Sequence, residues 1–395
     1  MLSEERRQEV IGLCGSLVRQ QSYSGGEKDA AGELERFFRR KGFGEVFYDG
    51  YGCVIGAVHG GRPGPRVLLD GHIDTVPVTD AESWGHPPFA AEIRGGRMYG
   101  RGTSDMKGAV AAMACAVANF AEDTGGDFPG SLYLAGVVHE ECFEGVAARS
   151  VSSLVKPDYV IIGEASELNL KIGQRGRAEL RLEAFGKAAH SANPEKGVNA
   201  VYTLLRAAEA LRALAPAEHP VLGRGILELT DIKSSPYPGA SVVPSYCAAT
   251  YDRRLLVGET KESVLAPIEN ALRLLSDGDP AFSASVSVAQ GKERCYTGAA
   301  IEGERFFPGW LFDADAPFVG AAYRALKEAG FSPAVTQYNF CTNGSHYAGE
   351  AGIPTLGLGP SREDLAHTRD EYIELSQLTD AVSCYEAVIG ALLAL

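Results

Sequence analysis

The sequence predicts an α/β protein in which a three-layer α/β/α domain is interrupted by an inserted ferredoxin-like α+β domain. Two observations predict the outer domain: short apolar runs alternate with helical patterns, and polar clusters follow the ends of several runs. The insertion is predicted because the pattern changes near residue 175 to the order β-α-β-β-α-β. We therefore expect a discontinuous outer domain at 1–175 and 292–395, and an inserted domain at 176–291.

Helical periodicity and short apolar runs define the elements of the outer domain. Helices are expected at 4–20, 27–41, 107–120, 145–154, 318–329 and from Ser376 onward. The apolar runs suit buried strands, which we expect at 54–58, 67–69, 131–138, 158–162, 334–337 and 354–358.

Alternating apolar and polar residues characterise the strands of the insertion, and two helical patterns separate them. The expected strands are 178–185, 226–232, 245–253 and 282–289, and the expected helices are 197–214 and 260–275. The insertion is long enough to fold around its own core, and 395 residues exceed what one core usually supports.

Composition narrows the possible partners and the cellular location. The formal charge of −14 opposes non-specific attraction to nucleic acid or anionic lipid, so neither a nucleic-acid partner nor a membrane is expected. Eight cysteines without a C-x-x-C pair predict reduced thiols rather than a disulfide framework. The N-terminus lacks the apolar region of a secretory signal, and no long apolar run could cross a membrane. These features predict a cytoplasmic protein.

The candidate chemistry begins with two motifs near strand ends. His72 and Asp74 alternate after the run VLLDG and should point the same way, so the carboxylate could orient the ring of a metal-ligating histidine. A structural or solvated H-x-D is the alternative. Asp105 follows a glycine-rich turn before a helix. It is either a helix N-cap or a bridging carboxylate held on that turn.

Three further acidic or histidine sites complete the candidate set. Glu140 and Glu141 follow an apolar strand, and adjacent like charges there are costly unless a cation shares them. One could bind metal while the other accepts a proton, although a solvated loop is the alternative. Glu164 ends another apolar strand, and His367 lies among acids late in the chain. Each of these two, taken alone, is more typical of an exposed surface.

Taken together, the set suits two divalent ions, with zinc expected and cobalt or manganese also compatible. Each ion would have one histidine and one carboxylate, and a shared carboxylate would join them. Two such ions would polarise a carbonyl group and activate water.

The runs DGHIDTVP, GRGTSDMKG, HEE, IGEAS, FGKAAHSANPEKGVNA and AHTRDE resemble the M20 family of metallopeptidases and deacylases. That family includes acetylornithine deacetylase, succinyl-diaminopimelate desuccinylase, aminoacylase and carboxypeptidase G2. The resemblance covers nearly the whole chain, with the motifs in the family's order. Within the family, the chain is most similar to hydrolases linked to selenium metabolism.

The resemblance implies a role for each residue that matches a family motif. Asp105 would bridge the two ions, Asp74 would orient His72, and Glu140 would be the general base and acid. The peptide bond after Asp105 would be cis. The remaining ligands would pair off, one pair for each ion: His72 with Glu164, and Glu141 with His367.

The insertion resembles the family's lid and dimerisation domain, which implies a homodimer. His190 matches the histidine that stabilises the oxyanion, and in dimeric relatives that histidine reaches the partner's active site. Arg254 matches the arginine that holds a substrate carboxylate, with Arg253 as a surface residue beside it. Asn343 and Gly344 fall in a substrate loop that departs from the GG or GTSD forms of better-known members, so it does not identify the substrate.

The predicted reaction is hydrolysis of an amide bond in an N-acyl amino acid or small peptide that carries a free carboxylate. Water activated by two metal ions would attack, with Glu140 as the general base. Two alternatives keep the fold: an N-carbamoyl amino acid amidohydrolase and a catalytically inactive scaffold. A serine hydrolase is excluded because the chain lacks a G-x-S-x-G nucleophile elbow.

Overall fold

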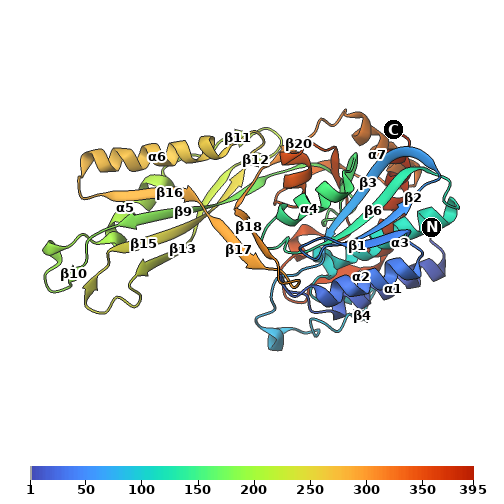
Figure 1. Cartoon of the computed structure of the whole chain (residues 1–395), viewed down its shortest axis with the longest axis horizontal. Helices are drawn as coiled ribbons and strands as arrows, with labels where there is room; N and C mark the ends of the chain where they lie inside the picture. Colours follow the sequence, from blue (N-terminus) through green and yellow to red (C-terminus); the bar gives the residue numbers. More distant parts are fainter. Residues whose placement is uncertain (1) are drawn as a thin grey trace. The chain divides into compact units, whose positions relative to one another are not determined.

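The computed structural model describes residues 2–395, which form two compact units (Figure 1). The first unit contains the segment that ends at Gln174 together with Lys292–Glu302 and Leu311–Leu395. The second contains Arg175–Gly291 and Gly303–Trp310. A central mixed sheet in the first unit and a separate antiparallel sheet in the second confirm the predicted mixed α/β fold.

The main sheet of the first unit places three parallel strands side by side. β3 lies between β6 and β7 and is parallel to both, whereas β2 is antiparallel to β6. Because β6, β3 and β7 run in the same direction, their carboxyl ends open at one edge of the sheet. From β1 to β8 the order is β1 (Glu45–Tyr48), β2 (Val54–His59), β6 (Pro129–Val137), β3 (Arg62–His72), β7 (Tyr159–Ile162), β22 (Thr355–Gly357) and β8 (Leu170–Gln174), with β21 (Val335–Tyr338) paired to β8.

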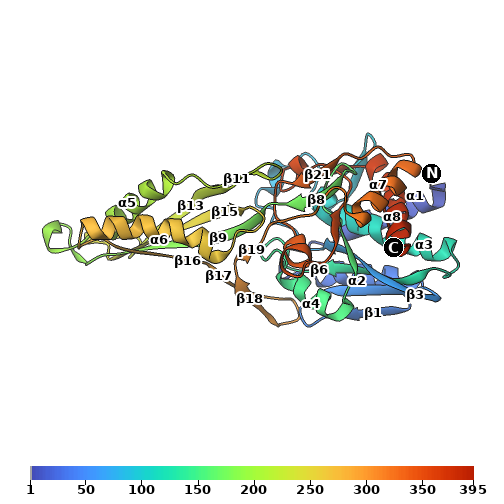
Figure 2. The same ribbon diagram turned by 90° about the horizontal axis from the view of Figure 1, so that it is seen from above.

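Six α-helices accompany this sheet (Figure 2): α1 (Glu4–Arg19), α2 (Lys28–Arg40), α3 (Gly108–Asp123), α4 (Val146–Val155), α7 (Pro317–Glu328) and α8 (Leu375–Leu393). α3 packs against α8 and contacts β3, whereas α2 contacts β2 and α4 contacts β6. Gly108 through Asn119 of α3 are all buried, which suits an alanine-rich helix that is apolar on every side.

A small three-stranded sheet joins distant parts of the first unit. It consists of β4 (Glu92–Arg94), β5 (Arg97–Tyr99) and β23 (Tyr372–Glu374), with β5 in the centre. β5 immediately precedes the turn that carries Asp105, and β23 follows His367. The pairing of Tyr99 with Tyr372 therefore brings these two predicted ligand segments together.

The second unit has the β-α-β-β-α-β order, with every neighbouring pair of strands antiparallel. The sheet order is β13 (Ile226–Ser235), β15 (Tyr246–Leu255), β9 (Gly176–Phe185) and β16 (Ser283–Val288), and the helices are α5 (Ala200–Arg212) and α6 (Lys261–Gly278). Leu180, Leu182 and Leu204 lie in its core. Thr260 and Ser263 form a capping box at the start of α6.

One segment of the second unit was expected in the outer domain. Residues 303–310 fall inside the predicted range 292–395, but β19 (Phe306–Phe307) pairs with β9. The remaining short strands are β10 (Ala189–His190), β11 (Glu218–His219), β12 (Gly223–Arg224), β14 (Val242–Val243), β17 (Gln290–Arg294), β18 (Ala300–Glu304) and β20 (Trp310–Leu311). Among residues 2–395, no helix has the length and apolar character needed to cross a membrane.

Candidate metal centre

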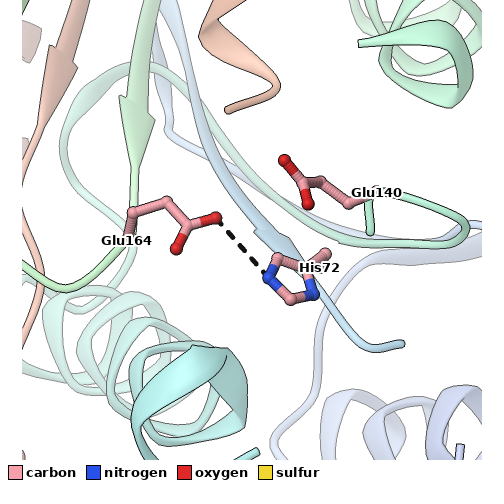
Figure 3. Close-up of side chains that lie close together, drawn as sticks. All are labelled: His72, Glu140 and Glu164. Carbon is pink, nitrogen blue, oxygen red and sulfur yellow. Dashed lines mark ion pairs between the residues drawn. The ribbon is translucent and has the colours of Figure 1, made fainter. Parts of the chain in front are cut away.

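Three of the candidate segments follow the parallel strands of the main sheet. His72 is the last residue of β3, Glu140 and Glu141 lie just after β6, and Glu164 lies two residues after β7. Since these strands are parallel neighbours, the side chains meet at the same sheet edge. Figure 3 shows Glu140 and Glu164 on either side of His72.

Asp105 and His367 come from turns rather than from the sheet. Asp105 lies in the irregular turn Thr103–Lys107 before α3, and the Asp105–Met106 peptide bond is cis, as predicted. His367 lies between a short helical turn, Glu363–Leu365, and β23, with a positive φ of 61°. The small β23-β5-β4 sheet holds both segments together.

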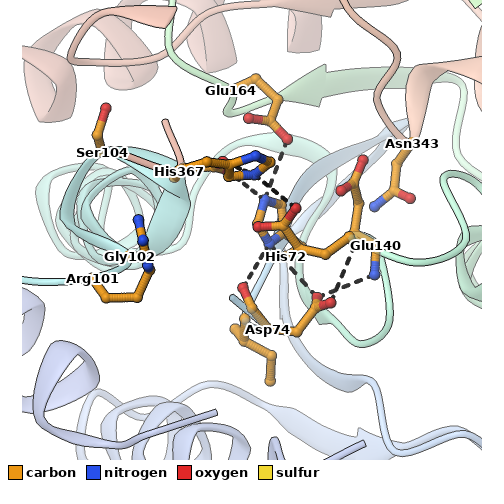
Figure 4. Close-up of polar contacts among 12 residues, drawn as sticks. His72, Asp74, Arg101, Gly102, Ser104, Glu140, Glu164, Asn343 and His367 are labelled. Atoms are coloured by element: carbon orange, nitrogen blue, oxygen red, sulfur yellow. Dashed lines mark hydrogen bonds and ion pairs between the residues drawn. The ribbon is translucent and has the colours of Figure 1, made fainter. Parts of the chain in front are cut away.

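The carboxylate of Asp105 faces two different histidines. Its Oδ1 lies 2.8 Å from Nε2 of His72, and its Oδ2 lies 3.2 Å from Nε2 of His367. Glu164 Oε1 lies 3.5 Å from the same His72 nitrogen, and Glu141 Oε2 lies 2.9 Å from that of His367. Figure 4 shows His72 and His367 beside Glu164 and Glu140. The arrangement is two ligand sets with one shared carboxylate.

Burial and crowding of charge dominate the electrostatics of the carboxylates. Burial raises the pKa of Glu140 well above its usual value, and the charges of Glu164, Glu144 and Glu141 add to the effect against that of His72. Burial also raises the pKa of Glu164 to about 8. Such a concentration of acids in a buried site is costly unless cations neutralise it.

The pKa values of the two histidines are also raised, which favours the charged form of each ring. Burial alone would lower the pKa of His72, but its hydrogen bond to Asp105 and the charge of Glu164 raise it well above the usual value. Hydrogen bonds to Asp105 and Glu141 raise the pKa of His367 to about 10. The raised pKa values favour a proton between each imidazole nitrogen and its carboxylate partner, and a divalent cation could replace that proton.

The donor set fits divalent metal ions. Ligand atoms of His72, Glu140 and Glu164 lie within 4.8 Å of one another, and so do those of His72, Asp105 and Glu141. Imidazole nitrogen and carboxylate oxygen are normal ligands of zinc and of similar ions. Glu140 Oε1 is buried and has no hydrogen-bond partner among residues 2–395, which leaves a carboxylate oxygen beside the ligands.

Asp74 contacts His72 through its backbone carbonyl, whereas we expected its carboxylate to orient the ring. His72 Nδ1 donates to the backbone carbonyl of Asp74 at 2.9 Å, while the carboxylate Oδ1 lies 3.6 Å away. The Asp74 carboxylate instead accepts from the backbone N–H groups of Glu140 at 3.1 Å and Glu141 at 3.2 Å, and from the Ser24 hydroxyl at 2.8 Å. Asp74 therefore holds the turn that carries both glutamates.

Asn343 and Gly344 use their polar groups inside the first unit. The Asn343 amide donates to Asp70 at 2.9 Å and accepts from the backbone of Gly145 at 2.9 Å. The Gly344 N–H donates to the Thr342 hydroxyl at 3.0 Å. Asn343 is 2% exposed, so its side chain joins neighbouring segments of the scaffold. The substrate-binding role of this pair stays a prediction.

His190 and Arg254 lie in different sheets of the second unit. His190 is exposed on β10, where its Nδ1 accepts from the backbone of Ala192 at 3.0 Å. Arg254 lies on β15 and pairs with Asp252 at 2.9 Å. Arg253 was expected at the surface but is 6% exposed and bonds to Glu259, because alternate residues of β15 face the core.

Two buried acids that shape the centre could not be identified from the sequence. Glu371 accepts from the backbone of the Asp105 turn, and Glu27 accepts from the backbone of His139 at 3.2 Å and Gly25 at 2.9 Å. Both are fully buried acids, yet the sequence places each among other polar residues. Only the position of Glu371 four residues after His367 hinted at a link to the site.

A cavity of about 350 Å³ lies beside His367 in the first unit. Arg369 and Asp80 form an ion pair at its wall with a distance of 2.5 Å, and the Arg101 guanidinium lies over the Trp84 ring. The lining residues are Val76, Pro77, Thr79, Asp80, Trp84, Arg101, His367 and Arg369. Space for a small molecule therefore adjoins one of the candidate ligands.

Comparison with known proteins identifies the family. Residues 68–391 match the model of peptidase family M20/M25/M40, so the chain belongs to this family of metal-dependent hydrolases. A protein of Escherichia coli K12 named "Uncharacterized protein YgeY" is 31% identical over 368 residues, which cover 92% of this chain and 89% of that protein. A succinyl-diaminopimelate desuccinylase of Caulobacter sp. strain K31 is 28% identical, and the matched residues cover 96% of this chain and 95% of that protein.

Solved structures share the fold at lower sequence identity. The M20 family metallo-carboxypeptidase Sso-CP2 of Sulfolobus solfataricus has a TM-score of 0.77 at 16% identity, with all of both chains covered. The aminopeptidase PepT of Bacillus cereus has a TM-score of 0.75 at 21% identity, with 98% of each chain covered. These similarities show the fold, and the family match places the chain in a family of hydrolases.

Proposed function

We propose that the chain is a dinuclear-metal hydrolase that cleaves the amide bond of an N-acyl amino acid or a small peptide. One observation carries the proposal: the two oxygens of Asp105 face the Nε2 atoms of His72 and His367, and each histidine has its own glutamate. A carboxylate shared between two such sets is what a pair of neighbouring divalent ions requires.

His72, Asp105 and Glu164 would hold one ion, and Asp105, Glu141 and His367 the other. Zinc suits these ligands, and cobalt or manganese would also bind. When bound, the two ions polarise the substrate carbonyl and lower the pKa of water. Because His72 Nδ1 donates to the Asp74 carbonyl, Nε2 is the ring nitrogen that would give up its proton and bind an ion.

Glu140 moves the proton in this mechanism. Its buried Oε1 is unpaired among residues 2–395, so it can accept a proton from the attacking water. Because burial raises its pKa, the carboxyl group holds that proton until it passes to the leaving amine nitrogen. Asp74 positions Glu140 through the backbone N–H at 3.1 Å.

Residues of each unit, taken separately, have proposed roles in substrate binding. The cavity beside His367 would hold one side group of the substrate. Arg254 would bind a substrate carboxylate with parallel hydrogen bonds, and Asn343 and Gly344 would border the substrate. His190, on a lid domain at 176–291, would stabilise the oxyanion. A solved structure that shares the fold is a dipeptidase of Saccharomyces cerevisiae (TM-score 0.75, 15% identity), which agrees with a small peptide as substrate.

We further propose that the second unit mediates a homodimer. β13 is the edge strand of its sheet in the described chain, and Ile226, Leu229 and Ile232 on it are exposed. An apolar, unpaired sheet edge favours association with another chain.

The predicted place among hydrolases linked to selenium metabolism and the predicted cytoplasmic location stay predictions.

The proposal is tested by loading the metal-free protein with zinc, cobalt or manganese and assaying three substrate classes. Hydrolysis of N-acyl amino acids or dipeptides supports it. Turnover of N-carbamoyl amino acids alone would favour the carbamoyl amidohydrolase. Two bound ions without turnover of any class would favour an inactive scaffold.

A further inference from the structure

Glu371 is a fully buried acid whose carboxylate is surrounded by donors from one turn. Its Oε1 accepts from the backbone N–H groups of Gly102 at 3.0 Å, Ser104 at 2.8 Å and Asp105 at 3.1 Å. Its Oε2 accepts from the guanidinium of Arg101 at 2.6 Å. Figure 4 shows Arg101, Gly102 and Ser104 together on this turn. A single side chain thus fixes four donors of the segment that carries the shared carboxylate.

The same residue belongs to the segment of His367. It follows His367 by four positions, and its own carbonyl accepts from the N–H of Gly100 at 2.8 Å. β23 begins at the next residue and pairs with β5, which precedes Gly100. Glu371 is therefore the point at which the Asp105 turn and the His367 segment are joined by both side chain and backbone.

The geometry of Asp105 makes this junction relevant to metal binding. The Asp105 N–H bond to Glu371 holds the main chain of the residue whose two oxygens face His72 and His367. His367 is itself half exposed and lies in a turn rather than in a strand, so its position depends on its neighbouring segment. Groups that orient metal ligands in this way commonly change metal affinity by 10–100-fold.

We propose that Glu371 is a positioning residue that holds Asp105 and His367 in register for the second ion. The inference rests on the proposed dinuclear function. Because His72 and Glu164 follow strands of the main sheet, the ion they share with Asp105 depends less on Glu371. Loss of Glu371 should therefore weaken one of the two ions more than the other.

Asp49 provides a matched control. It is a buried acid whose Oδ1 also accepts from three backbone N–H groups, those of Tyr51, Gly52 and Cys53, at 2.8–3.0 Å. None of its hydrogen bonds within residues 2–395 reaches the Asp105 or His367 turns. Asp49→Asn should lower the melting temperature while two ions remain bound.

The test measures zinc stoichiometry and affinity by chelator competition in wild type, Glu371→Ala, Glu371→Gln and Asp49→Asn. We expect the Glu371 variants to retain one tight ion and to bind the second about 10–100-fold more weakly. Two ions bound with wild-type affinity by a folded Glu371 variant would overturn the proposal. Should Glu371→Ala not fold, Glu371→Gln decides, because it keeps the side-chain shape and loses the charge that pairs with Arg101.

Thermal stability separates positioning from a merely structural role. The increase in melting temperature on adding zinc should shrink in the Glu371 variants and stay at the wild-type value in Asp49→Asn. Equal increases in all variants would contradict the proposal. If wild type binds two ions but hydrolyses nothing, the proposed reaction fails while the positioning role of Glu371 is still measured.

Discussion

The two units of the molecule hold their predicted functional residues in different ways. In the first unit, Asp105 contacts His72 and His367 directly, and buried acids fix the surrounding backbone. In the second, His190 is exposed at a short strand, and Arg254 pairs with an acid on its own strand. The contrast teaches that the residues of the candidate metal centre are already in contact with one another, whereas the proposed roles of His190 and Arg254 require a bound substrate.

This difference predicts which kinetic constant a substitution in each unit affects. Changes in the first unit should alter metal binding and kcat, because they affect ions and proton transfer. In the second unit, loss of Arg254 should act chiefly on KM, because it would remove a contact to a part of the substrate remote from the reacting carbonyl. Loss of His190 should instead lower kcat, because this residue would stabilise the oxyanion.

The largest effect is expected for Glu140→Gln, which removes the proton acceptor. We predict that kcat falls by at least about 10²-fold while two ions stay bound, since general acid–base groups contribute about 10²–10⁴-fold. Steady-state kinetics with metal analysis checks this. Glu350→Gln, whose carboxylate pairs with Arg149 and His346, is the control and should keep the wild-type kcat. Near-normal turnover by metal-loaded Glu140→Gln would show that another group moves the proton.

Metal affinity should rise steeply with pH. Hydrogen bonds raise the pKa of His367 to about 10 and burial raises that of Glu164 to about 8 in the metal-free protein, so protons compete with the ions below these values. Each displaced proton contributes about tenfold in affinity per pH unit. Chelator competition between pH 6 and pH 8 measures the slope. An affinity independent of pH would mean that these groups do not bind the metal.

The same pKa shifts predict a pH dependence of stability without metal. A folded pKa above the unfolded value stabilises the protein fully below the unfolded pKa, and this contribution is lost as pH rises through the folded pKa. Chelator-treated protein should therefore lose stability between about pH 5 and pH 8 as Glu164 ionises, whereas zinc should reverse the loss. Melting curves across this range, with and without zinc, check the sign.

Asp74→Asn should have a smaller effect than loss of Glu140. The N–H groups of Glu140 and Glu141 bind different oxygens of Asp74, so the single amide oxygen of asparagine would leave one of them without its acceptor and loosen the turn that carries both glutamates. We expect metal affinity to fall about 10–100-fold. Asp127→Asn, an exposed acid paired with Arg62, is the control for loss of a carboxylate. Unchanged affinity in Asp74→Asn would restrict Asp74 to a structural role.

The smallest effect is expected in the second unit, for Arg254→Ala. It should raise KM for free-carboxylate substrates by about tenfold, the contribution of a hydrogen bond to a charged group, and change KM little for amidated analogues. Arg181→Ala, on β9, should affect neither class. Equal effects of Arg254→Ala on both classes would rule out a carboxylate contact.

Most elements of the fold could be predicted because their signals are local. α3 is apolar over three turns, and β9 and β15 alternate between buried and less buried residues along their length. β1 and the β23-β5-β4 sheet were not predicted, since short strands with mixed burial carry little periodicity. β8 was not predicted either, because it is buried throughout but carries the polar residues Lys171 and Gln174. The association of 303–310 with the second unit also depends on a two-residue pairing, which no local pattern reveals.

The candidate site was predictable only in part for a related reason. His72, Asp105, Glu141, Glu164 and His367 follow recognisable motifs, and the structure brings them together. The contacts of Glu371 with Asp105 span 266 residues, and those of Glu27 with His139 span 112. They join a side chain to a backbone N–H group, and any residue type supplies that N–H, so the sequence carries no signal for the pairing.

The most direct measurement is anomalous diffraction at the zinc edge from crystals of the zinc-loaded protein. The account predicts two peaks, one contacted by His72 and Glu164 and the other by Glu141 and His367, with Asp105 contacting both. A single peak, or two peaks that do not share Asp105, would contradict the dinuclear centre.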